Sequence, residues 1–135
     1  MLIEIDFNSE EAFYLQLKNQ IIMHIAKAEL MPGESLPSVR DMAGQIGINM
    51  HTVNKAYSVL REEGYLELDR RRGAVISLNA DRKRAVEELE LQLMGAVARA
   101  FCRELTPEEI RLALDRVIGQ FRFDLNGKEK ASSGK

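Results

Sequence analysis

Apolar positions recur along most of this chain with the spacing of helices, and in a few places with the spacing of strands. Over residues 2–7 apolar and acidic side chains alternate, which predicts a short half-buried strand. Residues 9–29 carry apolar side chains at every fourth position, so we expect a helix there, with Ser9 as its N-cap. The following segment, 30–37, contains a Pro-Gly turn dipeptide and is predicted to be a loop.

Two short helices joined by a tight turn are predicted over residues 38–63. Ser38 is placed to cap the first helix, and Gly47 can end it because glycine adopts the left-handed backbone conformation without strain. Asn49 can cap the second helix, whose apolar stripe consists of Val53, Ala56, Tyr57 and Leu60. The opposite face carries mostly short polar groups and one cation: Met50, His51, Thr52, Asn54, Lys55 and Ser58. Such a face suits a helix in the DNA major groove, although a helical hairpin that is merely wetted by solvent has the same pattern.

A basic hairpin is predicted to follow these two helices. Residues 65–69 and 73–78 have the pattern of two strands, and their connector contains Arg70, Arg71 and Arg72 followed by Gly73. Three arginines at a hairpin tip favour contact with phosphates or with a minor groove, and a solvated turn is the alternative. A helix, a helix-turn-helix and a basic hairpin in this order are typical of a winged helix, in which the hairpin is the wing.

From Asp81 onward two further helices are predicted, the second starting at Thr106 and Pro107. Apolar positions in the first of them step by three and four residues, close to the coiled-coil spacing. Two such helices cannot bury all their apolar side chains against each other, so we expect a homodimer; folding back onto the winged helix is the alternative. The side chains expected at the dimer interface are Val86, Leu89, Leu93, Val97, Ala100, Leu114, Val117 and Phe121.

Together these elements predict an α+β chain that is mostly α. A winged helix-turn-helix is expected over residues 1–78, and a two-helix C-terminal dimerisation unit over residues 79–123. Residues 124–135 are poor in apolar side chains, and we expect them to form a disordered tail.

Composition and charge narrow the classes of function. The chain has 135 residues and a net charge of -2, which disfavours a nonspecific nucleic-acid coat but allows a local basic patch. No apolar run approaches the ~20 residues of a membrane span, and the acidic N-terminus does not resemble a signal peptide, so we expect a cytoplasmic protein without membrane contact. One cysteine and two distant histidines provide neither a metal-ligand spacing nor a catalytic arrangement. We therefore expect no enzyme, no catalytic residue, no metal and no cofactor.

The strings LPSVRDMA, IGINMHTVNKAYSVLREEGYLEL and RRGAVISL resemble the DNA-binding domain of the GntR transcriptional regulators. The string from Asn49 to Tyr57 is similar to the YtrA-like branch in particular, as is a C-terminal part of only two helices. The resemblance implies a homodimeric repressor that binds double-stranded operator DNA, typically at genes for membrane transporters. The residues that it implies touch DNA are Arg40, Asn49, His51, Thr52, Asn54, Lys55, Arg71, Arg72 and Gly73.

This chain also departs from the family pattern. Met50 and Asn54 stand where many relatives have arginine, and the wing lacks one glycine of the usual Gly-x-Gly-Thr string. We expect Arg40, Lys55 and the wing arginines to contact phosphates, and Asn54 to hydrogen-bond adenine. Residues 82–84 are cationic and either contact phosphates or form a solvated face. The sequence indicates no effector, and the alternative function is a winged-helix adaptor that binds protein.

Overall fold

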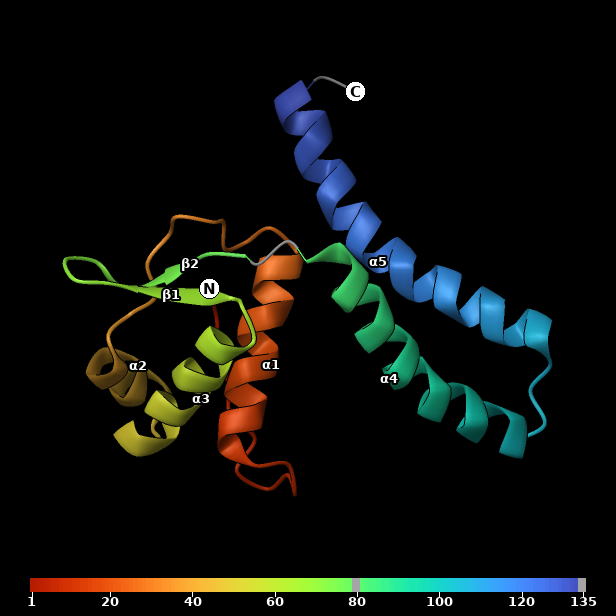
Figure 1. The fold of residues 1–135 in the computed structure, drawn as a ribbon, viewed down its shortest axis with the longest axis horizontal. Helices are drawn as coiled ribbons and strands as arrows, with labels where there is room; N and C mark the ends of the chain where they lie inside the picture. The colour runs from red at the N-terminus through yellow and green to blue at the C-terminus, as the bar shows by residue number, and fades with distance from the viewer. Residues whose placement is uncertain (79–80, 134–135) are drawn as a thin grey trace. The chain divides into compact units, whose positions relative to one another are not determined.

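A computed structural model of the chain describes residues 1–78 and 81–133. It divides into two compact units, Met1–Asn79 and Ala80–Lys135, and Figure 1 shows the elements of each. The elements are α1 (Phe13–Ala26), α2 (Val39–Ile46), α3 (Met50–Glu62), β1 (Leu66–Asp69) and β2 (Gly73–Ile76) in the first unit, and α4 (Arg82–Cys102) and α5 (Pro107–Ser133) in the second. Among the helices of the described residues, none is both long and apolar enough to cross a membrane.

The core of the first unit surrounds α3, because α1, α2 and β1 all contact this helix. The predicted apolar stripe of α3 is confirmed, and Val53, Ala56 and Leu60 have no solvent exposure. Burying a large apolar side chain stabilises a fold by about 1.5–3 kcal/mol. This stripe therefore fixes the rotation of α3 about its own axis and leaves the opposite face in solvent. The largest fully buried side chains of the unit are Leu17, Ile21, Met42, Leu60, Ile76 and Val53.

Side-chain caps begin both α2 and α3, and Gly47 ends α2, as predicted. The Ser38 hydroxyl accepts a hydrogen bond from the backbone N–H of Asp41 (3.1 Å), and the Asn49 carboxamide oxygen accepts one from the N–H of His51 (2.6 Å). Gly47 has a φ of 75° and ends α2. A side chain at this φ would be strained, which explains why the turn uses glycine.

Tyr57 adds a tie between α3 and the chain before α2. Its hydroxyl donates to the carbonyl of Pro37 (2.8 Å), and burial raises the pKa of the Tyr57 hydroxyl above its ordinary value. The hydroxyl therefore keeps its proton and remains a donor at physiological pH.

The predicted hairpin is confirmed, with β1 and β2 antiparallel and Leu66 opposite Ile76. The segment that we predicted to be a loop pairs with the other edge of β2. Gly33 N–H donates to the Ile76 carbonyl, Ile76 N–H donates to the Glu34 carbonyl, and Leu36 N–H donates to the Ala74 carbonyl, all at 2.8 Å. The pairing left no periodic signal in the sequence, because Leu36 is the only apolar side chain in residues 33–36.

The predictions for the N-terminus were wrong in two respects. Residues 2–7 form no strand, and α1 begins at Phe13 instead of directly after Ser9. The Ser9 hydroxyl instead accepts from the N–H of Glu11 (3.1 Å), while the Glu11 carbonyl accepts from the side chain of Gln16 (2.9 Å). These bonds hold residues 9–11 in a turn outside the helix.

Side chains of α1 form the backbone hydrogen bonds that a neighbouring strand would otherwise form with residues 2–6. Gln16 accepts from the N–H of Asp6 (2.8 Å) and donates to its carbonyl (3.0 Å), and Gln20 makes the same pair of bonds with Glu4 (3.0 and 2.6 Å). His24, one turn further on, contacts the carbonyl of residue 2 (2.9 Å). Two residues of extended chain span about 6.6–6.8 Å, and four residues of helix span about 6 Å. Every second residue of the N-terminal segment can therefore bond every fourth residue of α1.

In the second unit, the predicted start of α5 is confirmed by a reciprocal capping box. Glu109 N–H donates to the Thr106 hydroxyl (3.1 Å), and Thr106 N–H donates to the Glu109 carboxylate (2.9 Å). The helix continues to Ser133, so it includes most of the segment 124–135 that we expected to be a disordered tail; residues 134–135 lie outside the described residues. Lysine, glutamate and alanine at 128–131 favour helix regardless of their low hydrophobicity.

Replacing Gln16 by alanine should lower the free energy of unfolding by about 1–3 kcal/mol, because a buried side chain would lose three hydrogen bonds. Urea denaturation of the full chain, followed by circular dichroism, measures the change. Gln45→Ala is the matched control, since Gln45 is exposed on α2 and should contribute less than about 0.5 kcal/mol. Equal losses in the two variants would contradict a stabilising role for the Gln16 ladder, the set of hydrogen bonds that Gln16 and Gln20 form with the backbone of Asp6 and Glu4.

Candidate nucleic-acid interface

The side chains predicted to read DNA lie on the face of α3 opposite its buried stripe. His51, Asn54 and Lys55 are exposed, and Thr52 is half-buried at the edge of this face. Asn49 is exposed as well, but its carboxamide oxygen already caps α3. The amide nitrogen of Asn49, which is a donor, forms no hydrogen bond among the described residues and is available for an external partner.

Arg40 lies in the first turn of α2 with its side chain in solvent. No acidic side chain of the described residues forms an ion pair with it. In Figure 1, α2, the start of α3 and the tip of the hairpin all lie toward the left of the first unit. An unneutralised cation at this side is suited to a phosphate group.

Lys55 is held by the aromatic ring of Tyr14, a residue of α1. Its ammonium nitrogen lies 4.0 Å from the centroid of the Tyr14 ring. A cation over an aromatic face gains about 0.5–1 kcal/mol at an exposed site. The contact restricts the Lys55 ammonium to the edge of the exposed α3 face. The Lys55 side chain therefore loses less conformational entropy when it binds an anion. No sequence signal could identify this pair, because α1 and α3 meet only through the tertiary fold.

The tip of the wing is organised by Asp69. One oxygen of its carboxylate accepts from the backbone N–H groups of Arg71 (2.8 Å) and Arg72 (3.0 Å), and these bonds hold the pKa of Asp69 below its ordinary value. Gly73 follows with a φ of 75°, which closes the turn. The tip is therefore an ordered turn whose geometry depends on an ionised carboxylate.

The three wing arginines differ in what they contact. The guanidinium of Arg72 donates to the carbonyl of Gly33, so it ties the wing to the segment that pairs with β2. Arg70 and Arg71 are exposed, and their side chains form no ion pair within the described residues. Arg70, which the resemblance did not include, is therefore as available for a phosphate as Arg71 is.

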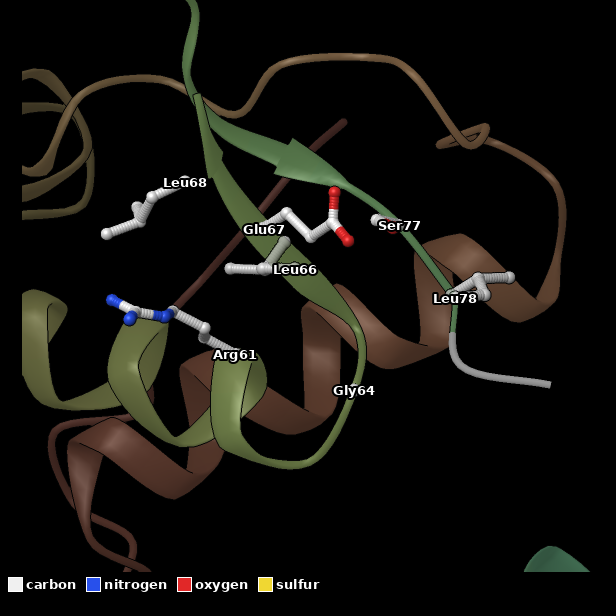
Figure 2. Close-up of a pocket in the computed structure, with 7 residues that line it drawn as sticks. All are labelled: Arg61, Gly64, Leu66, Glu67, Leu68, Ser77 and Leu78. Carbon is white, nitrogen blue, oxygen red and sulfur yellow. The ribbon is translucent and has the colours of Figure 1, made fainter. Parts of the chain in front are cut away.

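A shallow groove of about 550 Å³ lies between the end of α3 and the wing, and Figure 2 shows the residues that line it. The polar groups of this groove do not converge, because Glu67 turns toward Ser77 while Arg61 extends toward Leu68. A ligand site normally has several polar groups that meet at one point in an apolar pocket. We assign no ligand to the groove, and the described residues contain no cluster of three or more metal-ligating side chains.

Comparison with known proteins gives consistent results. Residues 13–76 match the family described as bacterial regulatory proteins, gntR family. The chain is 36% identical over 109 residues to the HTH-type transcriptional regulator YhcF of Bacillus subtilis, covering 77% of this chain and 88% of that protein. It is 43% identical over 79 residues to the HTH-type transcriptional repressor YtrA of the same organism, covering 58% and 61% of the two chains.

A solved structure extends this similarity to three dimensions. The structure of YtrA from Sulfolobus acidocaldarius, a GntR-family transcription factor, is 40% identical with a TM-score of 0.62, and the match covers 73% of this chain and 99% of that chain. The predicted winged helix-turn-helix followed by C-terminal helices is confirmed as the fold. The matches are to transcription regulators and not to enzymes.

Replacing Asp69 by alanine should disorder the tip of the wing, because the amides of Arg71 and Arg72 would lose their acceptor. Acidification should weaken the same two bonds, because a neutral carboxyl is a weaker acceptor than a carboxylate. The folded-state pKa is below the unfolded value, so the ionised carboxylate stabilises the turn above the unfolded pKa and this stabilisation is lost as the pH falls through the folded pKa. Amide hydrogen exchange at residues 71 and 72 measures both effects, and Asp69→Asn, which keeps an acceptor oxygen, should retain more protection. Unchanged exchange in the alanine variant would contradict the role of Asp69.

Proposed function

The chain belongs to the GntR family of bacterial regulatory proteins, and from this premise we propose that it is a homodimeric repressor that reads a palindromic operator with α3 and the wing. The observation that carries the proposal is the uncovered polar face of α3. The cations around this face, Arg40, Lys55 and Arg71, have no ion-pair partner among the described residues. The polar groups of such a surface can bond base edges in a groove, and the surrounding cations can contact the phosphates on either side of it.

Each part of this surface has a proposed role. Arg40, Lys55 and Arg71 neutralise phosphates and set the register of α3 in the major groove. Asn54, exposed on the next turn after the start of α3, bonds the N6 and N7 atoms of an adenine through its carboxamide. His51 and Thr52 offer further hydrogen bonds to base edges. Arg72 supports the wing through Gly33, and the wing tip with Gly73 approaches the minor groove.

A second copy of the chain is the proposed partner of α4 and α5. None of the described side chains of these helices is buried, and several large apolar ones are exposed. The most exposed on α4 are Leu91 (74%) and Met94 (71%), which the predicted interface did not include. Apolar surface of this extent in a water-soluble helix normally marks an interface. We therefore add these two residues and Phe101 to the proposed dimer surface.

The remaining predicted interface residues divide into two groups. Val86, Leu89, Leu114 and Val117 are exposed, while Leu93, Val97, Ala100 and Phe121 are half-buried. Two copies would place two wings and two α3 helices on DNA, with half-site centres about 34–36 Å apart for each helical turn of separation.

The genes that the protein controls are proposed from resemblance alone. Similarity to the YtrA repressor supports repression, and the YtrA-like pattern supports an operator at a transporter operon. The proposed site of action is the cytoplasm, where the operator DNA is found.

Replacing Arg40 by alanine should weaken binding to all DNA sequences alike and lower the slope of log K against log salt by about 0.9 for each half-site, because each protomer of the proposed dimer loses one phosphate contact. Asn54→Ala should instead abolish the preference for one A·T pair in each half-site. Selection of duplexes from a random pool, followed by salt-dependent fluorescence anisotropy, measures both effects. Arg111→Ala, which removes a cation of α5, is the control and should change neither quantity. An Arg40 variant with unchanged salt dependence would contradict the assignment of this face.

Replacing both Leu91 and Met94 by aspartate should convert the dimer into monomers, because two exposed apolar side chains of the interface become charged. Loss of bivalent binding should then weaken binding to a two-half-site duplex by about 100-fold while leaving single half-site affinity unchanged. Sedimentation velocity measures the oligomeric state, and Gln92→Asp at the exposed neighbouring position is the matched control. A double variant that remains dimeric would place the interface elsewhere.

A further inference from the structure

We propose that Met50 reads the 5-methyl group of a thymine in each half-site of the operator. The inference rests on the proposed function, since it requires α3 to lie in a major groove. It adds a base identity that the polar residues of α3 do not specify, and it gives a role to a residue that the resemblance left out of the DNA-binding set.

Met50 lies at the start of α3 and outside the core. Met50 is the first residue of α3 and follows the cap residue Asn49 directly. Its side chain is 46% exposed, and it is absent from the apolar core that Val53 and Leu60 share. The start of α3 therefore presents one large apolar group among polar ones, on the part of a recognition helix that contacts base edges.

Met50 and Asn54 lie one helical turn apart on α3. Residues four apart in a helix lie on the same side, about 6 Å apart along the axis. Successive bases of a DNA strand are about 3.4 Å apart, so two side chains with this separation face base pairs within about two steps of each other. Both side chains are exposed, and neither belongs to the apolar core of the described residues.

The thymine methyl is the one apolar group among the base edges of the major groove. A thioether has no hydrogen-bond donor and is only a weak acceptor, so Met50 cannot replace the water on the polar edge of a G·C pair. Removing water from such a polar edge without supplying a hydrogen-bond partner costs free energy, whereas a methyl group has no hydrogen bonds with water to lose. Methionine is also unbranched and adapts its shape to an irregular surface.

Uracil in place of thymine isolates the methyl group, because the two bases differ in no other atom. The wild-type chain first enriches duplexes from a random pool, and each thymine of the enriched duplex is then replaced by deoxyuridine in both half-sites. At one position near the adenine bound by Asn54, we expect the affinity to fall by about fourfold for each half-site, the ratio for burying one methyl-sized group. Met50→Ala should bind thymine and uracil duplexes equally well, and Met50→Leu should keep most of the difference.

Met23 supplies a matched control, since this methionine of α1 has nearly the same exposure, 45%. Met23→Ala should retain the full preference for thymine over uracil. The inference is overturned if no uracil substitution weakens the wild-type chain, or if the difference persists in Met50→Ala. Circular dichroism of each variant verifies that it folds. A wild-type chain that enriches no sequence at all would overturn the proposed function and this inference with it, which distinguishes the two failures.

Discussion

Burial of one stripe of α3 is the constraint on which the rest of the first unit depends. Val53, Ala56 and Leu60 are completely removed from solvent, and they can be so only in one rotation of the helix. That rotation determines which side chains remain outside, and these include Asn54 and Lys55. Burial of the apolar stripe thereby positions exposed side chains that are not part of the core. The exposed residues of α3 can therefore be substituted without changing the orientation of the helix.

Hydrogen bonds that join distant segments hold the surroundings of α3 in place. Tyr57 bonds the Pro37 carbonyl, and Arg72 bonds the Gly33 carbonyl, so both ends of the 33–37 segment are tied to the elements that flank it. The same segment pairs with β2 through its backbone. The wing, α2 and α3 are thus linked through one short stretch of chain, and a displacement of the wing would be transmitted to the start of α2. For a surface that must match both a groove and a phosphate backbone, this linkage limits the number of arrangements that must be ordered on binding.

The sequence predicted several features that have a local cause, although it misassigned Ser9, and it missed those whose partners are distant in the chain. Ser38, Gly47 and Asn49 act on residues within one helical turn, so their capping roles could be identified from spacing alone. The Gln16 ladder, the edge pairing of residue 33 and the contact between Tyr14 and Lys55 join segments that meet only in the folded chain. The alternation of residues 2–7 correctly marked Ile3 as buried and Ile5 as half-buried, although Phe7 is exposed. It could not reveal that glutamine side chains, not a strand, would satisfy the backbone.

The two units satisfy their apolar surface in different ways, and this difference bears on how the protein acts. The first unit encloses Leu17, Ile21 and Met42 within its own fold, whereas α4 and α5 leave Leu91 and Met94 in solvent. A unit with its own core can keep its shape in any oligomeric state. In the proposed dimer, the pair of helices without such a core would depend on the second copy for burial, so its structure would be coupled to association. In the proposed dimer, whatever weakens association would weaken DNA binding without altering α3 itself, because the two α3 helices would be linked only through α4 and α5. Regulation of the proposed dimer would need no pocket near α3, since an influence on the α4 and α5 surface would be sufficient.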